Sequence, residues 1–324
     1  MLWPMAAQAA QYYVSPSGND SNNGSLNNPW QTLPYAFGRL VAGDVLYLRG
    51  GTYYLHDYYT SLKGTASAPI TIQSYSGEHA LVDGGLPDFK STSTGGWELV
   101  NASLGLYRSK SSFSASFVRA WLLDYNAQIV EFSSAANMEA TNYSLVSGFT
   151  PFYMGPGVQL RPDGHIYIRL QYNPYDLTDV SGSATSPSPG DTNPNKNRIS
   201  IFTSEHILAL VGAAYLHFKD IDFSYAKQIF DIRGGTHHIE LDRCKLNFGS
   251  YGLVIRDNIH DWNVHDCEFK QTTDRYVATV ALVSRLRKRF YESDRFAPGP
   301  STVGLLAVGA SRKEKRESFL CSAR

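Results

Sequence analysis

The strongest constraint on the fold of this chain is a repeat of 23 residues in its second half. Segments that begin at Leu216, Ile239 and Trp262 carry apolar residues at the same positions. A second segment repeats with the same step, since 232–234 (IRG) corresponds to 255–257 (IRD). A fixed period of this size with two or more short β runs is typical of a solenoid in which each repeat forms one coil. The leucine and asparagine positions of a leucine-rich repeat are absent, so the pattern predicts a parallel β-helix.

Stacking of the coils turns the repeat into columns of side chains, because neighbouring parallel strands lie about 4.8 Å apart. Four apolar columns are predicted to face inward: Leu216/Ile239/Trp262, Phe218/Leu241/Val264, Ile221/Cys244/Cys267 and Phe223/Leu246/Phe269. We expect Cys244 and Cys267 to be buried thiols rather than a disulfide or a metal site. Four polar columns are predicted to face outward: His217/Glu240/Asn263, Lys219/Asp242/His265, Asp220/Arg243/Asp266 and Asp222/Lys245/Glu268.

The chain before the repeats has a different organisation. Apolar residues at helical spacing over 30–41 predict an amphipathic segment that caps the open end of the solenoid. Short β runs follow, and then hairpin-like β segments and a long polar loop. The predicted organisation is a signal-peptide remnant at 1–11, an N-terminal cap with the first coils at 12–86, an inserted β module at 87–200, β-helix coils at 201–274 and a basic tail at 275–324.

The two ends of the chain carry separate expectations. Ala7-Gln8-Ala9 has the small-x-small form of a secretory cleavage site, which predicts a secreted protein, extracellular or periplasmic. After Asp274 the register is predicted to stop, because a fourth copy would place Arg285, Arg287 and Glu292 at apolar positions. The tail is then either a basic arm for an acidic partner or, as we prefer, a segment foreign to a truncated solenoid, as after a change of reading frame.

Composition excludes several classes of protein. The chain has 29 basic and 29 acidic residues, but 275–324 hold 11 basic and four acidic ones, a net charge of +7 that leaves −7 for the rest. The neutral total, with no basic tract before about residue 270, argues against a nucleic-acid partner. No apolar run approaches the roughly 18 residues of a membrane-spanning helix. We therefore expect a monomer with neither a nucleic-acid nor a membrane partner.

Three motifs near the N-terminus carry a resemblance to a known family. They are V-S-P-x-G-x-D at 14–20, P-W-x-T-L-x-x-A at 29–36 and G-D-V-L-Y-L-R-G-G-T-Y at 43–53. Together with the coils they resemble secreted right-handed β-helix proteins of the pectate-lyase-like superfamily, over residues 12–274. The resemblance implies a right-handed parallel β-helix, a polysaccharide substrate and a groove formed by the outward columns. Members of this superfamily include polysaccharide lyases and glycoside hydrolases, so the fold alone does not define the activity.

The favoured hypothesis is a polysaccharide lyase that cleaves an acidic polysaccharide by Ca²⁺-assisted β-elimination. Such an enzyme needs a cation to neutralise the sugar carboxylate, a base for the C5 proton and a donor for the leaving oxygen. Candidate catalytic residues are Lys245, Arg243 and His265. Candidate substrate-binding residues are Arg233, Arg256 and Glu240. Candidate Ca²⁺ ligands are Asp220, Asp222, Asp266 and Glu268.

Other interpretations of the same residues stay open. Carboxylates beside Lys245 would raise its pKa and make it a poorer base. Alternating charges also suit a solvated sheet face, and two carboxylates one or two coils apart suit a glycoside hydrolase equally well. A non-catalytic sugar-binding or surface protein and an inactive truncated fragment are further alternatives. The histidines favour no metal site, because their spacing matches no tight ligand motif and His237 and His238 are expected on opposite faces of a strand.

Overall fold

The computed structural model describes residues 9–143, 151–173, 190–256 and 259–270, and the backbone of 275–279 and 286–290. It contains two compact units, one within 1–84 and 205–324 and the other formed by 85–204. The predicted signal peptide lies almost wholly outside the described residues, as does the tail beyond 290. None of the helices in the described ranges is long and apolar enough to cross a membrane.

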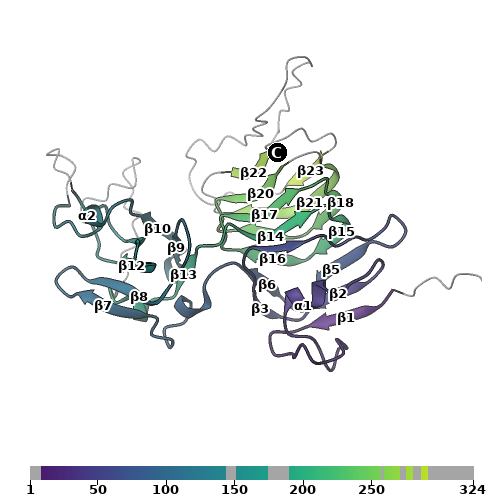
Figure 1. Ribbon diagram of the computed structural model, residues 1–324, viewed down its shortest axis with the longest axis horizontal. Coiled ribbons are helices and arrows are strands. Elements are labelled where there is room, and N and C mark those ends of the chain that lie inside the picture. The colour runs from purple at the N-terminus through teal and green to yellow at the C-terminus, as the bar shows by residue number, and fades with distance from the viewer. Residues whose placement is uncertain are drawn as a thin grey trace, which may run out of the picture. The chain divides into compact units, whose positions relative to one another are not determined.

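The first unit is a stack of coils, each of which adds strands to three parallel sheets (Figure 1). The first sheet contains β1 (Gln11–Val14), β2 (Val45–Leu48), β5 (Ile70–Ser74), β15 (Ala214–Lys219), β18 (His237–Asp242), β21 (His260–Lys270) and β23 (Leu286–Phe290). The second contains β3 (Gly51–Tyr54), β6 (Ala80–Asp83), β16 (Ile221–Ser224), β19 (Lys245–Asn247) and the end of β21. The third contains β4 (Tyr58–Thr60), β14 (His206–Val211), β17 (Gln228–Arg233), β20 (Tyr251–Ile255) and β22 (Arg275–Thr279). This arrangement is the predicted parallel β-helix.

The register agrees with the columns predicted from the repeat. Leu216 pairs with Ile239 and Ile239 with Trp262, so the first inward column is confirmed. The thiols of Cys244 and Cys267 are both free and fully buried, also as predicted. One continuous apolar core extends from Val14 to Cys267 through the whole stack. Burial of these columns is the main stabilising term for a fold in which each coil contacts only its neighbours.

Sharp corners separate the sheets, and they recur with the same step as the repeat. Tyr215, His238 and Asp261 have φ of 53°, 53° and 55°, and a second set, Asp220/Arg243/Asp266, has φ of 55°, 51° and 54°. A single left-handed residue turns the chain, and Asp tolerates this conformation better than most residues because its short side chain bonds locally. The Asp220/Arg243/Asp266 column therefore lies at a corner between the first and second sheets.

The predicted helix over 30–41 is shorter than expected. The helix α1 covers only Leu33–Phe37, with Thr32 as its N-cap and Gly38 at its C-cap. The carboxylate of Asp20 fixes the N-cap, because it accepts hydrogen bonds from Gln31 N, Thr32 N and the Thr32 hydroxyl. Four of the five apolar side chains at this spacing join the core as predicted, Trp30, Leu33, Phe37 and Leu40, but Val41, beyond the end of the helix, is 61% exposed.

Strand pairing continues past Asp274, but not with the step of the repeat. In β22 Arg275 pairs with Tyr251, and in β23 Leu286 pairs with Trp262, both at a step of 24 residues rather than 23. The parallel ladder needs only backbone groups, so one inserted residue shifts the sequence register without preventing the pairing. That the tail is foreign to the solenoid stays a prediction.

The second unit is a largely antiparallel sheet with its own core. Its strand order is β13 (Ile199–Phe202), β9 (Arg119–Leu122), β10 (Ala127–Glu131), β11 (Gly157–Leu160), β12 (His165–Arg169), β8 (Leu106–Ser112) and β7 (Trp97–Asn101). Short helices join them: η1 (Pro87–Phe89), η2 (Leu123–Tyr125), α2 (Ala135–Met138) and η3 (Pro194–Lys196). Arg169 is buried here, where its guanidinium donates to the carbonyls of Met138 and Ala140 and lies 3.8 Å from the Tyr153 ring.

Candidate functional site

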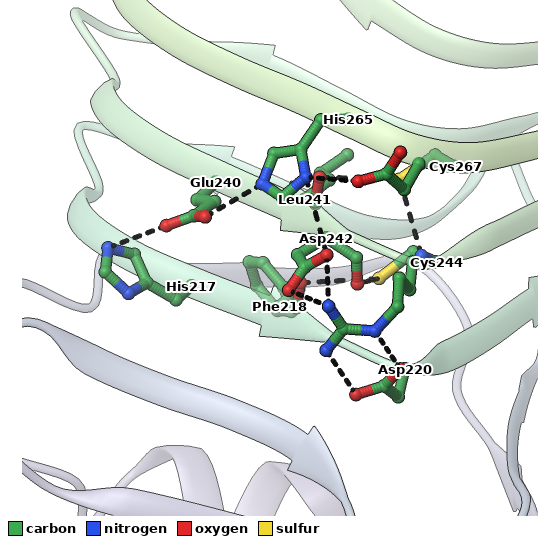
Figure 2. A network of polar contacts seen from close by, with 11 residues as sticks. His217, Phe218, Asp220, Glu240, Leu241, Asp242, Cys244, His265 and Cys267 are labelled. Atoms are coloured by element: carbon green, nitrogen blue, oxygen red, sulfur yellow. Dashed lines mark hydrogen bonds and ion pairs between the residues drawn. The ribbon is translucent and has the colours of Figure 1, made fainter. Parts of the chain in front are cut away.

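A connected set of polar side chains covers the outward face of β15, β18 and β21 (Figure 2). Parallel pairing places His217 beside Glu240 on the next coil, and Lys219 beside Asp242. Asp242 in turn lies beside His265 on the third coil. We call the set His217, Glu240, Asp242, His265, Asp266, Arg243 and Asp220 the outward network. Since alternate side chains of a strand point to opposite faces, the inward columns fix the direction of this network.

His265 is the centre of the outward network. Its Nε2 lies 2.9 Å from Glu240 Oε1, and its Nδ1 lies 3.1 Å from Asp266 Oδ2 and 3.4 Å from Asp242 Oδ1. Glu240 also reaches His217, with 3.4 Å between Oε2 and Nε2. Glu240 thus bridges histidines from the coils on either side of it, and His265 is surrounded by three carboxylates.

Arg243 closes the other end of the network. Its Nε and Nη2 donate to the two oxygens of Asp220 at 2.7 and 2.9 Å, and its Nη1 lies 2.7 Å from Asp242 Oδ2. Asp242 is 7% exposed, while Arg243 and Asp220 are about half exposed. Asp242 is therefore shared between Arg243 and His265, and two cations satisfy one buried carboxylate.

These contacts shift the pKa values of the network in opposite directions. The hydrogen bond to Glu240 raises the pKa of His265, and the nearby carboxylates add to it against the effect of burial. For Glu240, burial raises the pKa, but the His265 hydrogen bond and the neighbouring positive charges outweigh it and lower the pKa. Burial lowers the pKa of His217 despite the attraction of Glu240. Hydrogen bonding to Asp220 raises the pKa of Arg243, which therefore stays protonated.

The column Asp222/Lys245/Glu268 forms a second polar group on β16, β19 and β21. Lys245 Nζ and His79 Nε2 each lie 3.3 Å from Asp222 Oδ2, and Glu268 pairs with Lys270 at 2.7 Å. Burial raises the pKa of Asp222, although Lys245 and His79 oppose the effect. The candidate base Lys245 and the candidate ligands Asp222 and Glu268 thus occupy one column, but each carboxylate already contacts a basic side chain.

Arg233 and Arg256 lie together on the third sheet, away from the outward network. Both bind Asp231, whose carboxylate is 2% exposed: Arg256 Nε donates to Oδ1 at 2.8 Å, and Arg233 Nη2 donates to Oδ2. Asp231 lies within a run of buried residues in β17, and the repeat analysis gave it no role. Its acidic character between two buried apolar residues was the available signal, since a buried charge requires a partner.

The four carboxylates predicted to bind Ca²⁺ do not converge on one point. Asp220 pairs with Arg243, Asp222 with Lys245, and Glu268 with Lys270, which leaves Asp266. Asp266 instead joins Asp242 and His265 in a group whose ligand atoms all lie within 4.8 Å of one another. Ca²⁺ takes oxygen ligands in flexible geometry, so the two carboxylates Asp242 and Asp266 fit this ion, with water and substrate oxygens in the other positions.

With the geometry established, the relatives of the chain can be compared. Residues 12–112 match the family model of the Pel9A-like, right-handed β-helix region. Over this segment the chain is similar to a pectate-lyase-like, right-handed β-helix. Its helix is therefore right-handed, as the resemblance implied. Similarity to curated lyases is strong but local: the chain is 42% identical to pectate lyase PEL9 of Emericella nidulans over 84 residues, 26% of this chain and 20% of that protein.

A second relative shows the same partial coverage. Pectate lyase L of Dickeya dadantii is 33% identical over 105 residues, which cover 30% of this chain and 22% of that protein. The matched segments thus span about a fifth of the curated lyases. Among solved structures, the pectate-lyase-like fold is shared with a glycoside hydrolase (TM-score 0.53, 14% identity, 84% of this chain and 68% of that one) and with XylC bound to xylose (TM-score 0.51, 12% identity, 85% and 54%).

The structure brings together some of the candidate residues and separates others. Arg243, His265, Glu240, Asp220 and Asp266 belong to the outward network, with Lys245, Asp222 and Glu268 in the adjoining column. Arg233 and Arg256 belong to a different sheet. The network members that sequence reasoning left without a role are Asp242 and His217. Both residues stood in polar columns of the repeat. The contact of Asp242 with His265 and the contact of His217 with Glu240 are what place them in the network.

Proposed function

We propose that the protein is a carbohydrate-active enzyme that cleaves an acidic polysaccharide by β-elimination. The observation that carries the proposal is the row of His, Lys, Arg and carboxylate side chains on three successive coils of a helix whose start matches the Pel9A-like region. The names of two of the curated relatives, both pectate lyases, support this class of reaction. The substrate, on this proposal, lies along the outward face with its uronate carboxylate toward the network.

Each candidate residue then has a distinct task. Arg243 stays protonated and holds Asp242 and Asp220 in place, so it orients the carboxylates and does not act as a base. The hydrogen bond to Glu240 and the nearby carboxylates raise the pKa of His265, which favours its protonated form and suits a donor to the leaving oxygen. Lys245, whose Nζ lies 3.3 Å from Asp222 Oδ2, is left as the base for the C5 proton.

Ca²⁺ belongs to the same proposal. Asp242 and Asp266 would hold the ion, and the ion would supply charge neutralisation of the uronate carboxylate and thereby a more acidic C5 proton. The buried Asp242 and the more exposed Asp266 contribute hard oxygen donors at this corner, and His265 Nδ1 lies 3.4 and 3.1 Å from their oxygens.

The test is the formation of unsaturated uronate products from polygalacturonate, followed by ultraviolet absorbance with Ca²⁺ and with chelator. We expect absorbance to rise with Ca²⁺, and Lys245→Met to reduce the rate by at least about 100-fold, the lower end for loss of general acid–base catalysis. Asp242→Asn should reduce the rate by weakening the response to Ca²⁺. Lys227→Met is the matched control, since Lys227 pairs with Glu205 at 3.0 Å on the third sheet. No absorbance on any uronate polymer, or equal activity of Lys245→Met and wild type, would contradict the lyase proposal.

A glycoside hydrolase is the second candidate, favoured by one observation. Burial raises the pKa of Asp222, and a raised carboxyl pKa is the direction of change that a general acid requires. Reducing ends released without unsaturated products, and lost in Asp222→Asn, would support hydrolysis. Binding of polysaccharide without turnover would instead support a non-catalytic sugar-binding protein.

A further inference from the structure

A group of histidines lies at the opposite end of β18 and β21 from the outward network. The 23-residue step places His237-His238 directly beside His260-Asp261 on the next coil, since His237 pairs with His260. His238 and Asp261 are both left-handed corner residues. The prediction that His237 and His238 point to opposite faces is wrong: their Nδ1 atoms lie 2.8 Å apart, because the corner at His238 turns the chain.

Three ligand atoms of this group converge. His260 Nδ1 lies 2.7 Å and His238 Nε2 3.6 Å from Asp261 Oδ2, and all three ligand atoms are within 4.8 Å of one another. Each side chain is between about a third and a half exposed, so the group is open to solvent. We propose that His238, His260 and Asp261 bind a divalent transition metal such as Zn²⁺ at this corner of the β-helix.

The distances and the donor set both suit this type of ion. Zn²⁺ binds imidazole nitrogen and carboxylate oxygen at about 2.0–2.2 Å with tetrahedral geometry, which places neighbouring ligand atoms about 3.3 Å apart. The separations of Asp261 Oδ2 from His260 Nδ1 and from His238 Nε2, 2.7 and 3.6 Å, lie on either side of that value. Two imidazoles and one carboxylate favour Zn²⁺, Ni²⁺ or Cu²⁺ over Ca²⁺ and Mg²⁺, which take oxygen. The Asp242/His265/Asp266 group has only one imidazole, so the two sites prefer different metals.

Neighbouring rings hold the two histidines in position. His237 stacks on His260 with ring centroids 4.9 Å apart and planes 2° apart, and Tyr215 stacks on His238 at 4.4 Å. Coordination through His238 Nε2 requires the proton to lie on Nδ1, and this N–H then donates to His237 Nδ1. His237 thus acts as an outer partner that selects the tautomer of His238 competent for metal binding.

The test measures metal binding by isothermal titration calorimetry of the full chain, without a polyhistidine tag and after removal of metals. We expect one Zn²⁺ to bind and Ca²⁺ not to compete with it. His260→Gln and Asp261→Asn should each weaken Zn²⁺ binding by more than about tenfold, the lower value for loss of even an outer-shell partner. Asn at 261 retains the left-handed corner, so this variant keeps the fold. Addition of Zn²⁺ should also raise the Tm of wild type but not of these variants.

His56→Gln is the matched control, because His56 is an exposed histidine outside the group and contacts only the Gly84 carbonyl among the hydrogen bonds described. It should bind Zn²⁺ like wild type. The proposal is overturned if wild type binds no Zn²⁺, if His260→Gln and Asp261→Asn bind it unchanged, or if His265→Gln alone abolishes binding. Because the readout is binding, a failure of the lyase proposal leaves this result unaffected.

Discussion

At the scale of single residues, burial decides which ion pairs matter for stability. Asp231 and Asp220 each bind arginine, yet the first carboxylate is 2% and the second 47% exposed. Exposed pairs contribute about 0–1 kcal/mol, because water and salt screen the charges. A buried carboxylate that has lost contact with water depends entirely on its protein partners. Asp231 and Asp220 therefore allow the stability contribution of a buried and an exposed Asp–Arg pair to be compared in one protein.

We expect Asp231→Asn to lower the free energy of unfolding by about 1.5–3 kcal/mol, the range for hydrogen bonds to charged groups. The loss stays below that of a fully buried pair because Arg233 and Arg256 are each about a third exposed and can turn to water. Asp220→Asn, which keeps the left-handed corner, should cost less than about 1 kcal/mol. Urea unfolding measures both. Equal losses in the two variants would contradict this ranking of the ion pairs.

The Glu240–His265 pair predicts a defined pH dependence of stability. The pKa of His265 is raised in the folded protein, so its contribution is complete below the ordinary value of 6.5 and is lost as pH rises through the folded value. The pKa of Glu240 is lowered, so its contribution is present above the ordinary value of 4.5 and is lost as pH falls through the folded value. The stability difference between wild type and Glu240→Gln should therefore be largest between pH 4.5 and 6.5.

Chemical denaturation at a series of pH values measures this difference. Glu139→Gln is the control, since Glu139 pairs with Arg161 at 2.7 Å and with no histidine among its described contacts. Its difference from wild type should stay constant between pH 5 and 8, where neither Glu nor Arg titrates at ordinary pKa values. A difference for Glu240→Gln that keeps growing above neutral pH would rule out the assigned role of His265.

At the scale of strands and corners, the sequence repeat predicts the inward columns because apolar side chains at a fixed step have only one shared place to be buried. It also predicts which residues face outward, including His265 and Lys245. It does not predict the corners, because Tyr215, His238 and Asp261 share a backbone conformation but no side-chain type. For the same reason the repeat predicts the wrong face for His238. It also does not predict that Asp231 pairs with two arginines.

The central apolar column gives a direct test of the repeat. Leu241 is fully buried between Phe218 and Val264 on the neighbouring coils. We expect Leu241→Ala to lower the free energy of unfolding by about 2–5 kcal/mol, since it removes buried methyl groups and leaves a cavity between coils. Leu26→Ala is the matched control at an exposed position, with a loss under about 1 kcal/mol. If Leu241→Ala also lowered the free energy of unfolding by less than about 1 kcal/mol, the coils would have to repack around the cavity.

At the scale of the whole molecule, the chain has two cores that share no residue. The β-helix core contains residues up to Val82 and from Ile207 onward, while the other two clusters lie between Phe89 and Ile201. The second unit also begins and ends at neighbouring points, because Leu86 N donates to Ile201 O at 2.6 Å. A unit with its own core and adjacent ends has the usual properties of a domain inserted into another.

We therefore expect residues 85–204 to fold when expressed alone, and the β-helix to fold when a short Gly-Ser linker replaces them. Each piece should unfold cooperatively in differential scanning calorimetry, and the full chain should show two transitions, because each unit buries its own apolar surface. The transition of the β-helix should move with Leu241→Ala while that of the second unit stays in place. A single transition in the full chain, together with an unfolded isolated unit, would show instead that the two cores depend on each other for stability.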